Sequence, residues 1–159
     1  MPGLTKCSGN EVVIKNCGKI CTEGVTSFGN GTKVAVLNES GARSVRIWDK
    51  LTAHQAYIIA LYRHRYKAIR IIEEMVTAYS QSISSSRGTI GTGSQILSCR
   101  NIRNVRIGPH SKINGAINLD EGSINSCVED PVLIGPGVIM EHFIVCSGSM
   151  ITESTLVDK

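Results

Sequence analysis

Two histidines, His110 and His142, combine residue type and setting in a way that suits proton transfer. Imidazole exchanges a proton near neutral pH, so a histidine within hydrogen-bond reach of a hydroxyl or amine can act as a general base. Glu141 precedes His142 and its carboxylate would orient the ring, but adjacent strand residues face opposite sides, so the pair works only on a loop or turn. His110 follows Gly108-Pro109 and is expected to point outward from a corner. For both residues the alternative is a solvated side chain, and His54 and His64 fit surface or packing positions.

The element that positions both histidines is predicted from a run of aliphatic residues at steps of six or five. The run loses phase over residues 125–133 and then resumes, and it comprises Ile90, Ile96, Ile102, Ile107, Ile113, Leu119 and Ile124, then Ile134, Ile139, Val145, Ile151 and Leu156. Such steps are typical of a triangular coil in which each short strand buries one aliphatic side chain, with about 18 residues per coil. Gly and Asn, which tolerate a left-handed backbone, often follow these positions. We therefore predict β-helix coils over residues 88–159, and first coils within 1–41, where Ile14, Ile20 and Val25 keep similar steps.

Residues 42–87 interrupt this pattern and are predicted to form an α-helical insert. The segment lacks Gly and Pro before Gly88, and its apolar residues recur every three or four positions from Ile58 to Ile83, as on one face of a helix. Thr52 is a suitable N-cap and the serines at 84–86 a suitable stop, so the helical part spans about 52–84. One unbroken helix of that size would be roughly 48 Å long. We therefore expect a helical hairpin with its bend near residues 63–65.

The segments IGPHSKI and IGPGVIM resemble the hexapeptide-repeat signature of acyltransferases and sugar-nucleotide enzymes with left-handed parallel β-helix domains. Together with LYRHRYKAI and SSRGTIGTGSQI, they are similar to uncharacterised bacterial hexapeptide-repeat proteins, of Bacteroides-type organisms, that are labelled acyltransferases. The resemblance implies a trimer that uses acetyl-CoA or another acyl-CoA, with a sugar or sugar nucleotide as acceptor. It also implies a histidine as general base, which makes His142 and His110 the catalytic candidates. The chain ends in phase at residues 154–159 without an obvious cap, so we expect a fragment of a longer protein.

A non-catalytic structural or oligomerisation module is the competing hypothesis, and the scarcity of histidines favours it for this chain. No metal site is predicted, because three histidines do not converge and Cys127 and Cys146 lack a third ligand. The net charge of +4 is too small and too dispersed to predict nucleic-acid binding. The N-terminus resembles no signal peptide and no segment predicts a membrane span. With six cysteines in no recognisable disulfide or zinc pattern, we expect reduced thiols in a cytoplasmic protein.

Overall fold

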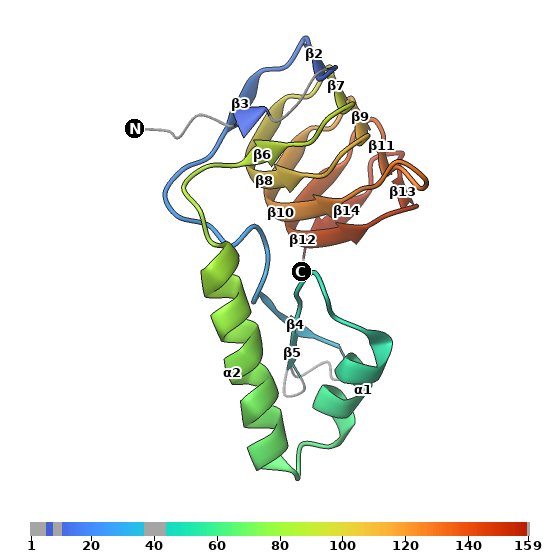
Figure 1. The fold of residues 1–159 in the computed structure, drawn as a ribbon. Helices are drawn as coiled ribbons and strands as arrows, with labels where there is room; N and C mark the ends of the chain where they lie inside the picture. Colours follow the sequence, from blue (N-terminus) through green and yellow to red (C-terminus); the bar gives the residue numbers. More distant parts are fainter. Residues whose placement is uncertain (1–5, 8–10, 37–43, 159) are drawn as a thin grey trace.

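A computed structural model describes residues 6–7, 11–36 and 44–158 as a parallel β-solenoid of about four turns that carries a helical insert (Figure 1). The solenoid strands are β1 (Lys6–Cys7), β2 (Val13–Lys15), β3 (Lys19–Cys21), β6 (Thr89–Ile90), β7 (Gln95–Leu97), β8 (Asn101–Ile107), β9 (Lys112–Asn114), β10 (Asn118–Asn125), β11 (Leu133–Ile134), β12 (Ile139–Cys146), β13 (Met150–Ile151) and β14 (Leu156–Asp158). The insert contains β4 (Lys33–Ala35), β5 (Ser44–Arg46), α1 (Ala53–Leu61) and α2 (Tyr66–Ile83). The prediction of a mainly β protein, with parallel coils interrupted by helices, is confirmed.

Each turn of the solenoid stacks on the next in parallel register. One sheet follows the order β1-β6-β8-β10-β12-β14, with β3 also paired to β8, and a second follows β13-β11-β9-β7-β2. Ile90, Ile107 and Ile124 pair in succession at equal sequence intervals, so each of these coils is one residue shorter than predicted. The next interval, from Ile124 to Val145, is longer, because a loop at 126–132 extends that coil. This loop is where the aliphatic run loses its phase.

From Ile90 onward, the solenoid core is the predicted column of aliphatic side chains, with two exceptions. Ile96, Ile113 and Leu119 are almost completely buried, as are the other predicted members from Ile90 to Ile134. Met140 is buried in place of the expected Ile139, and Leu156 is 72% exposed while Val157 packs against the core. The prediction was wrong at these two positions because two apolar residues stand side by side and either fits a step of five or six.

The insert begins and ends at one corner of the solenoid. Thr22, directly after β3, accepts a 2.7 Å hydrogen bond from the backbone N–H of Gly88, just before β6. β3 covers the first half of β8 and β6 covers its last residue, so the two strands occupy the place of one continuous strand in the coil above. Residues 22–88 therefore leave and re-enter a single coil.

The beginning of the insert lies closer to the N-terminus than predicted. Strand β4, which falls within the segment expected to form the first coils, pairs antiparallel with β5. Val25, expected to continue the aliphatic run, is 75% exposed. Its spacing fitted a coil by coincidence, because periodicity alone cannot distinguish a short connecting stretch of chain from a further strand.

The predicted helical hairpin is present. Thr52 caps α1 in a reciprocal arrangement with Gln55, as expected of a capping box, and Ser84 ends α2. The break between the helices falls at residues 62–65, where the bend was predicted. A small core of Val45, Ile59 and Ala60, with Ile72 packed against it, joins the helices to the β4–β5 hairpin. Within the described residues, no helix is both long and apolar enough to cross a lipid bilayer.

Candidate functional site

Three long strands of the solenoid share a sharp corner, and His142 lies at this corner. Asn104 in β8, Glu121 in β10 and His142 in β12 each have a left-handed backbone, with φ of 55°, 49° and 53°. The residues on either side of them pair in register across the three strands, so the three corners form one column. We call Asn104, Glu121 and His142 the corner column.

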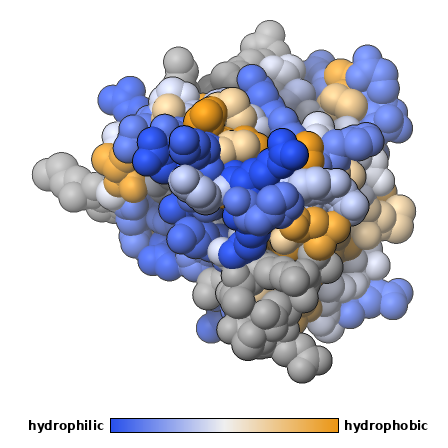
Figure 2. Space-filling view, turned by 90° about the horizontal axis from the view of Figure 1, so that it is seen from below, coloured by the Kyte–Doolittle hydropathy of each residue, from blue (hydrophilic) through white to orange (hydrophobic). Residues whose placement is uncertain are grey.

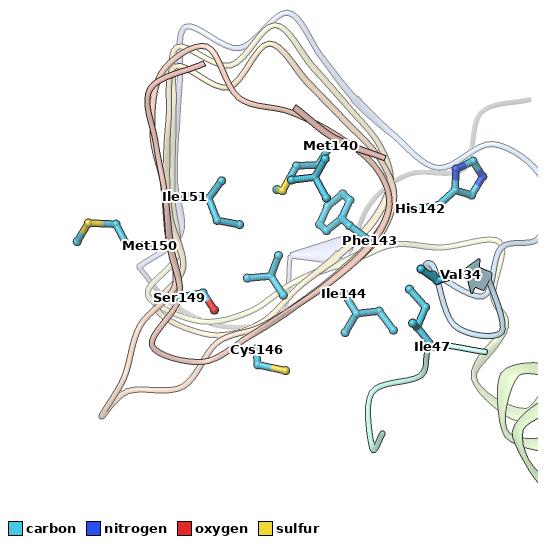
Figure 3. A pocket seen from close by; sticks show the side chains of 12 residues that line it. Val34, Ile47, Met140, His142, Phe143, Ile144, Cys146, Ser149, Met150 and Ile151 are labelled. Atoms are coloured by element: carbon cyan, nitrogen blue, oxygen red, sulfur yellow. The ribbon is translucent and has the colours of Figure 1, made fainter. Parts of the chain in front are cut away.

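The left-handed residue turns two consecutive side chains of β12 toward the outside. Met140 and Phe143 are buried in the core, whereas Glu141 and His142 between them are both partly exposed. Figure 3 shows His142 pointing away from the interior of the coils, while Phe143 points inward. Glu141 and His142 were predicted to act together only on a turn, because adjacent residues of a regular strand face opposite sides. The structure contains such a turn at this corner.

The first segment of the insert runs along the corner column and supplies hydrogen-bond partners to two of its members. The backbone N–H of Glu23 donates to Asn104 Oδ1 at 2.7 Å, and Thr26 Oγ1 donates to a Glu121 carboxylate oxygen. Asn104 Nδ2 donates to the other Glu121 oxygen at 2.6 Å. We call residues 22–31 the strap. The Nδ1 atom of His142, the third member, is buried and has no hydrogen-bond partner among the described residues.

The strap is held by the outer face of β10. Ser123 Oγ donates to the carbonyl of Phe28 at 2.7 Å, and Asn30 Nδ2 donates to Ser123 Oγ at 3.3 Å. Phe28 is 3% exposed. At Gly29, φ is +80° and an added Cβ would lie 2.6 Å from the carbonyl oxygen of Phe143. The strap therefore reaches the coil that carries His142 and leaves the solenoid there.

Two further carboxylates lie beside His142. Glu141 and Asp158 pair in register between β12 and β14, and one ligand atom from each of Glu141, His142 and Asp158 lies within 4.8 Å of the others. Asn118 Nδ2 donates to Glu141 Oε1 at 3.3 Å and so helps to fix that carboxylate. Asp158 was not among the site residues predicted from the sequence. It follows Glu141 by the same interval that separates Ile107 from Ile124, and this interval of one coil places it directly over Glu141.

The neighbouring charges of this corner are compensated. Arg103 forms an ion pair with Asp120 and a longer contact of 3.6 Å with Glu23, and the Asp120 carboxylate raises the pKa of Arg103. A 2.7 Å hydrogen bond from Lys19 lowers the pKa of Glu23 and raises that of Lys19. Glu141 and Asp158 form no ion pair with any residue that the structure describes. Along the described part of this corner, negative charge therefore remains uncompensated at the His142 end.

An apolar pocket of about 660 Å³ adjoins His142 (Figure 3). Phe143 and Ile144 of β12 form one part of its lining, and Val34 and Ile47 of the insert form another. The pocket extends over the last coil, where Ile151 and Val157 line it. An imidazole at the edge of an apolar recess can meet the polar end of a largely apolar ligand.

The other histidines lie elsewhere. His110 is also at a corner, with φ of 56°, but its ring stacks over Gly93, where an added Cβ would lie 2.6 Å from the imidazole. His64 contacts Tyr62 in the bend of the hairpin, and His54 lines a groove between the helices. The structure thus separates the two catalytic candidates, and among the described residues only His142 belongs to a cluster with two carboxylates.

Comparison with known proteins assigns the chain to a family through nearly its whole length. A model of the domain of unknown function DUF4954 matches residues 6–159. The chain belongs to this family. It is similar to an uncharacterised protein of Treponema pallidum (strain Nichols), with 30% identity over 151 residues, which are 88% of this chain and 21% of that protein. No solved structure matches the chain. The family carries no assigned activity, so the resemblance to hexapeptide-repeat acyltransferases remains a basis for proposals only.

Proposed function

We propose that this chain is a β-solenoid module that associates with further copies of itself through the helical insert. The observation that carries this proposal is the apolar surface of the insert that its own small core leaves uncovered. Along α2, Ile72 packs against the core and Val76 is buried, while Ile71, Met75 and Ala78 follow one line beside them. Ile71 is 65% exposed and Met75 is 45% exposed.

Helix α1 extends the same kind of surface. Tyr57, Ile58 and Leu61 are all exposed, and a groove of about 540 Å³ runs between the two helices, lined by Tyr62 and Ile69 among others. Figure 2 views this end of the molecule and shows hydrophobic patches set among hydrophilic side chains. Contiguous apolar surface with a polar rim is typical of an interface between proteins.

A second copy is the occupant that the charges around this surface favour. The rim carries Arg65, Lys67 and Arg70 near the start of α2 and Glu73 and Glu74 one turn further on. A patch with both signs of charge can complement an identical patch, whereas a strongly basic or acidic partner would meet repulsion from one of the two groups. Contact between two identical patches closes as a twofold dimer, whereas the trimer that the hexapeptide-repeat resemblance implies would bring two different surfaces of the chain together.

Sedimentation equilibrium of the full chain tests the proposal. We expect a mass that is a multiple of 17.1 kDa, and a monomer for the double substitution Ile71→Glu/Met75→Glu. The matched control is Thr77→Glu/Gln81→Glu, which adds the same charge to exposed positions on another side of α2 and should leave the mass unchanged. A monomeric wild type at about 100 µM, a concentration at which interfaces of ordinary size are populated, would contradict the proposal. So would equal dissociation of both variants.

Acyl transfer is a second candidate function, and the position of His142 at the apolar pocket favours it. There the imidazole would remove a proton from an acceptor hydroxyl or amine while the pocket received the pantetheine or acyl part of acetyl-CoA or another acyl-CoA. A sugar or sugar nucleotide is the acceptor that the hexapeptide-repeat resemblance supports. Acyl transfer ranks second to self-association because a catalytic imidazole is normally oriented by a hydrogen bond. Among the described residues, His142 Nδ1 lacks that hydrogen bond.

Calorimetry with acetyl-CoA tests this second candidate. Binding that His142→Gln weakens at least tenfold, and that His110→Gln leaves unchanged, would support it. The absence of heat at millimolar acetyl-CoA would remove it for this chain. Because the chain spans only 21% of the relative that it matches, the same titration on a full-length relative is the appropriate companion measurement.

A further inference from the structure

Glu141, His142 and Asp158 offer an imidazole nitrogen and two carboxylate oxygens on the outside of the solenoid, where two adjacent coils meet. We propose that these three residues bind a divalent transition-metal cation and that Zn²⁺ fits best. Nitrogen and oxygen donors in this ratio suit a borderline cation, whereas Mg²⁺ and Ca²⁺ prefer oxygen donors alone. Three protein ligands leave at least one coordination position for water or another small ligand.

The first observation behind the proposal is the unpartnered nitrogen of His142. In the corner column, Asn104 and Glu121 both receive hydrogen bonds from the strap, and His142 Nδ1 has no partner among the described residues. A buried polar atom without a partner carries a free-energy cost. Coordination of a cation removes such a cost when the metal occupies that nitrogen, or when it occupies the other nitrogen and orients the ring toward a water. The interruption of the hydrogen-bond pattern at this residue therefore points to a ligand.

The second observation is the uncompensated charge around that nitrogen. Asp120 is paired with Arg103, and Glu121 is bonded by Thr26 and Asn104, but Glu141 and Asp158 form no ion pair with a described residue. Stacking two carboxylates on neighbouring strands is unfavourable unless a cation lies between them. A divalent cation would neutralise both carboxylates while the imidazole remained uncharged.

The distances suit closure around a small cation. The three ligand atoms lie within 4.8 Å of one another. Ligand atoms at about 2.1 Å from a tetrahedral zinc are about 3.4 Å apart. The side chains would thus need to move by roughly 1 Å each, which small rotations about χ angles supply. Asn118, through its 3.3 Å hydrogen bond to Glu141, would hold the carboxylate in the way that outer residues orient metal ligands.

The cation would also have a structural consequence. Glu141 and His142 belong to β12 and Asp158 to β14, so a shared ion ties β14 to the preceding coil at the corner where the strap leaves. We therefore expect Zn²⁺ to raise the thermal unfolding midpoint of the chain, by mass action on the folded state.

Titration of the untagged full chain with ZnCl₂ by calorimetry tests the site. Cys127 and Cys146 are not buried and thiolates bind zinc, so the titration uses a Cys127→Ser/Cys146→Ser background. We expect one Zn²⁺ per chain, weaker binding of Mn²⁺ and none of Mg²⁺ at equal concentration. His142→Gln, Glu141→Gln and Asp158→Asn should each weaken Zn²⁺ binding at least 100-fold, and Asn118→Ala about tenfold.

The matched control is His110→Gln, which removes a corner histidine that forms no such ligand cluster with the residues that the structure describes and should not alter the affinity. Circular dichroism confirms that each variant folds, and Asp158→Asn is the variant least able to disturb folding because its side chain is exposed. No Zn²⁺ binding at millimolar concentration, or equal binding by wild type and all three ligand variants, overturns the proposal. Self-association is tested separately, since Ile71→Glu/Met75→Glu lies on the insert and should bind Zn²⁺ as the wild type does. Occupation by Zn²⁺ would commit the His142 lone pair and so argue against its role as a general base.

Discussion

The solenoid and the insert build their cores in different ways. In the solenoid, side chains one coil apart in the sequence stack in the same position, and one continuous column from Ile90 to Met140 is almost completely buried. In the insert, the core cluster contains only three fully buried residues among those described, Val45, Ile59 and Ala60, and exposed apolar side chains surround it. A repeating core thus supports itself, whereas the insert depends on its contacts at the solenoid corner and leaves much of its apolar surface exposed.

The largest expected effect comes from breaking the repeating core. Ile113 is 1% exposed and stacks between Ile96 and Ile134. Ile113→Ala should lower the free energy of unfolding by about 3 kcal/mol, because the rigid neighbouring coils cannot collapse into the cavity. Urea denaturation followed by circular dichroism measures it. Ile71→Ala in the insert is the control and should change stability by less than about 0.5 kcal/mol in the monomer. Equal losses would show that the two cores do not differ.

The same contrast determines what the sequence could predict. The aliphatic column from Ile90 to Ile134, the helical hairpin and the Thr52 cap follow from local periodicity and capping chemistry. The strap could not be predicted, because Phe28, Gly29 and Asn30 interact with residues far away in the sequence and follow no period. For that reason, the start of the insert was predicted too far from the N-terminus.

The candidate site was predictable in part. His142 stood out by residue type, and its outward position beside Glu141 depended on a turn that no local glycine or proline marked. The left-handed corner comes from stacking with Asn104 and Glu121, which is a property of three coils together. Asp158 was accessible in principle, since Glu141 and Asp158 differ by one coil length. The predicted coil, one residue too long, concealed that pairing.

A smaller effect is expected where the insert joins the solenoid. Gly29→Ala places a Cβ 2.6 Å from the Phe143 carbonyl oxygen at a φ of +80°, and should destabilise the docked strap by roughly 2 kcal/mol. Trp48, the single tryptophan of the chain, lies in the insert against Tyr79, so its fluorescence reports the insert, while circular dichroism reports the strands as well. We expect the fluorescence midpoint in urea to fall below the dichroism midpoint.

Gly24 provides the control for this substitution. It also has a left-handed φ of +69°, but an added Cβ there would meet nothing within 4 Å. Gly24→Ala should therefore lower the free energy of unfolding only through backbone strain, by about 1 kcal/mol. The fluorescence and dichroism midpoints in urea should then still coincide. Separation of the midpoints in both variants, or in neither, would contradict a specific role for the Gly29 contact.

The smallest effect, and the most local, concerns the charge that links the two regions. Asp49 of the insert forms an ion pair with Arg106, accepts a 3.1 Å hydrogen bond from Asn125 Nδ2 and contacts the Tyr79 hydroxyl at 3.4 Å. Burial raises the pKa of Tyr79, and the negative charge of Asp49 raises it further. A phenol whose folded-state pKa exceeds its unfolded value of about 10 adds stability below that unfolded value. That stability is lost as the pH rises through the folded-state pKa.

Ultraviolet titration at alkaline pH, with Tyr79→Phe subtracted, isolates this group. We expect Tyr79 to ionise above its ordinary range, and Asp49→Asn to lower its pKa part of the way, because the repelling charge is removed while burial remains. Glu74→Gln removes a carboxylate that is paired with Arg70 on an exposed part of α2, and should leave the Tyr79 titration unchanged. If Asp49→Asn has no more effect than Glu74→Gln, the Tyr79 phenol of α2 is not coupled to Asp49. Helix α2 is then not linked through that carboxylate to Arg106 of β8 and Asn125 of β10.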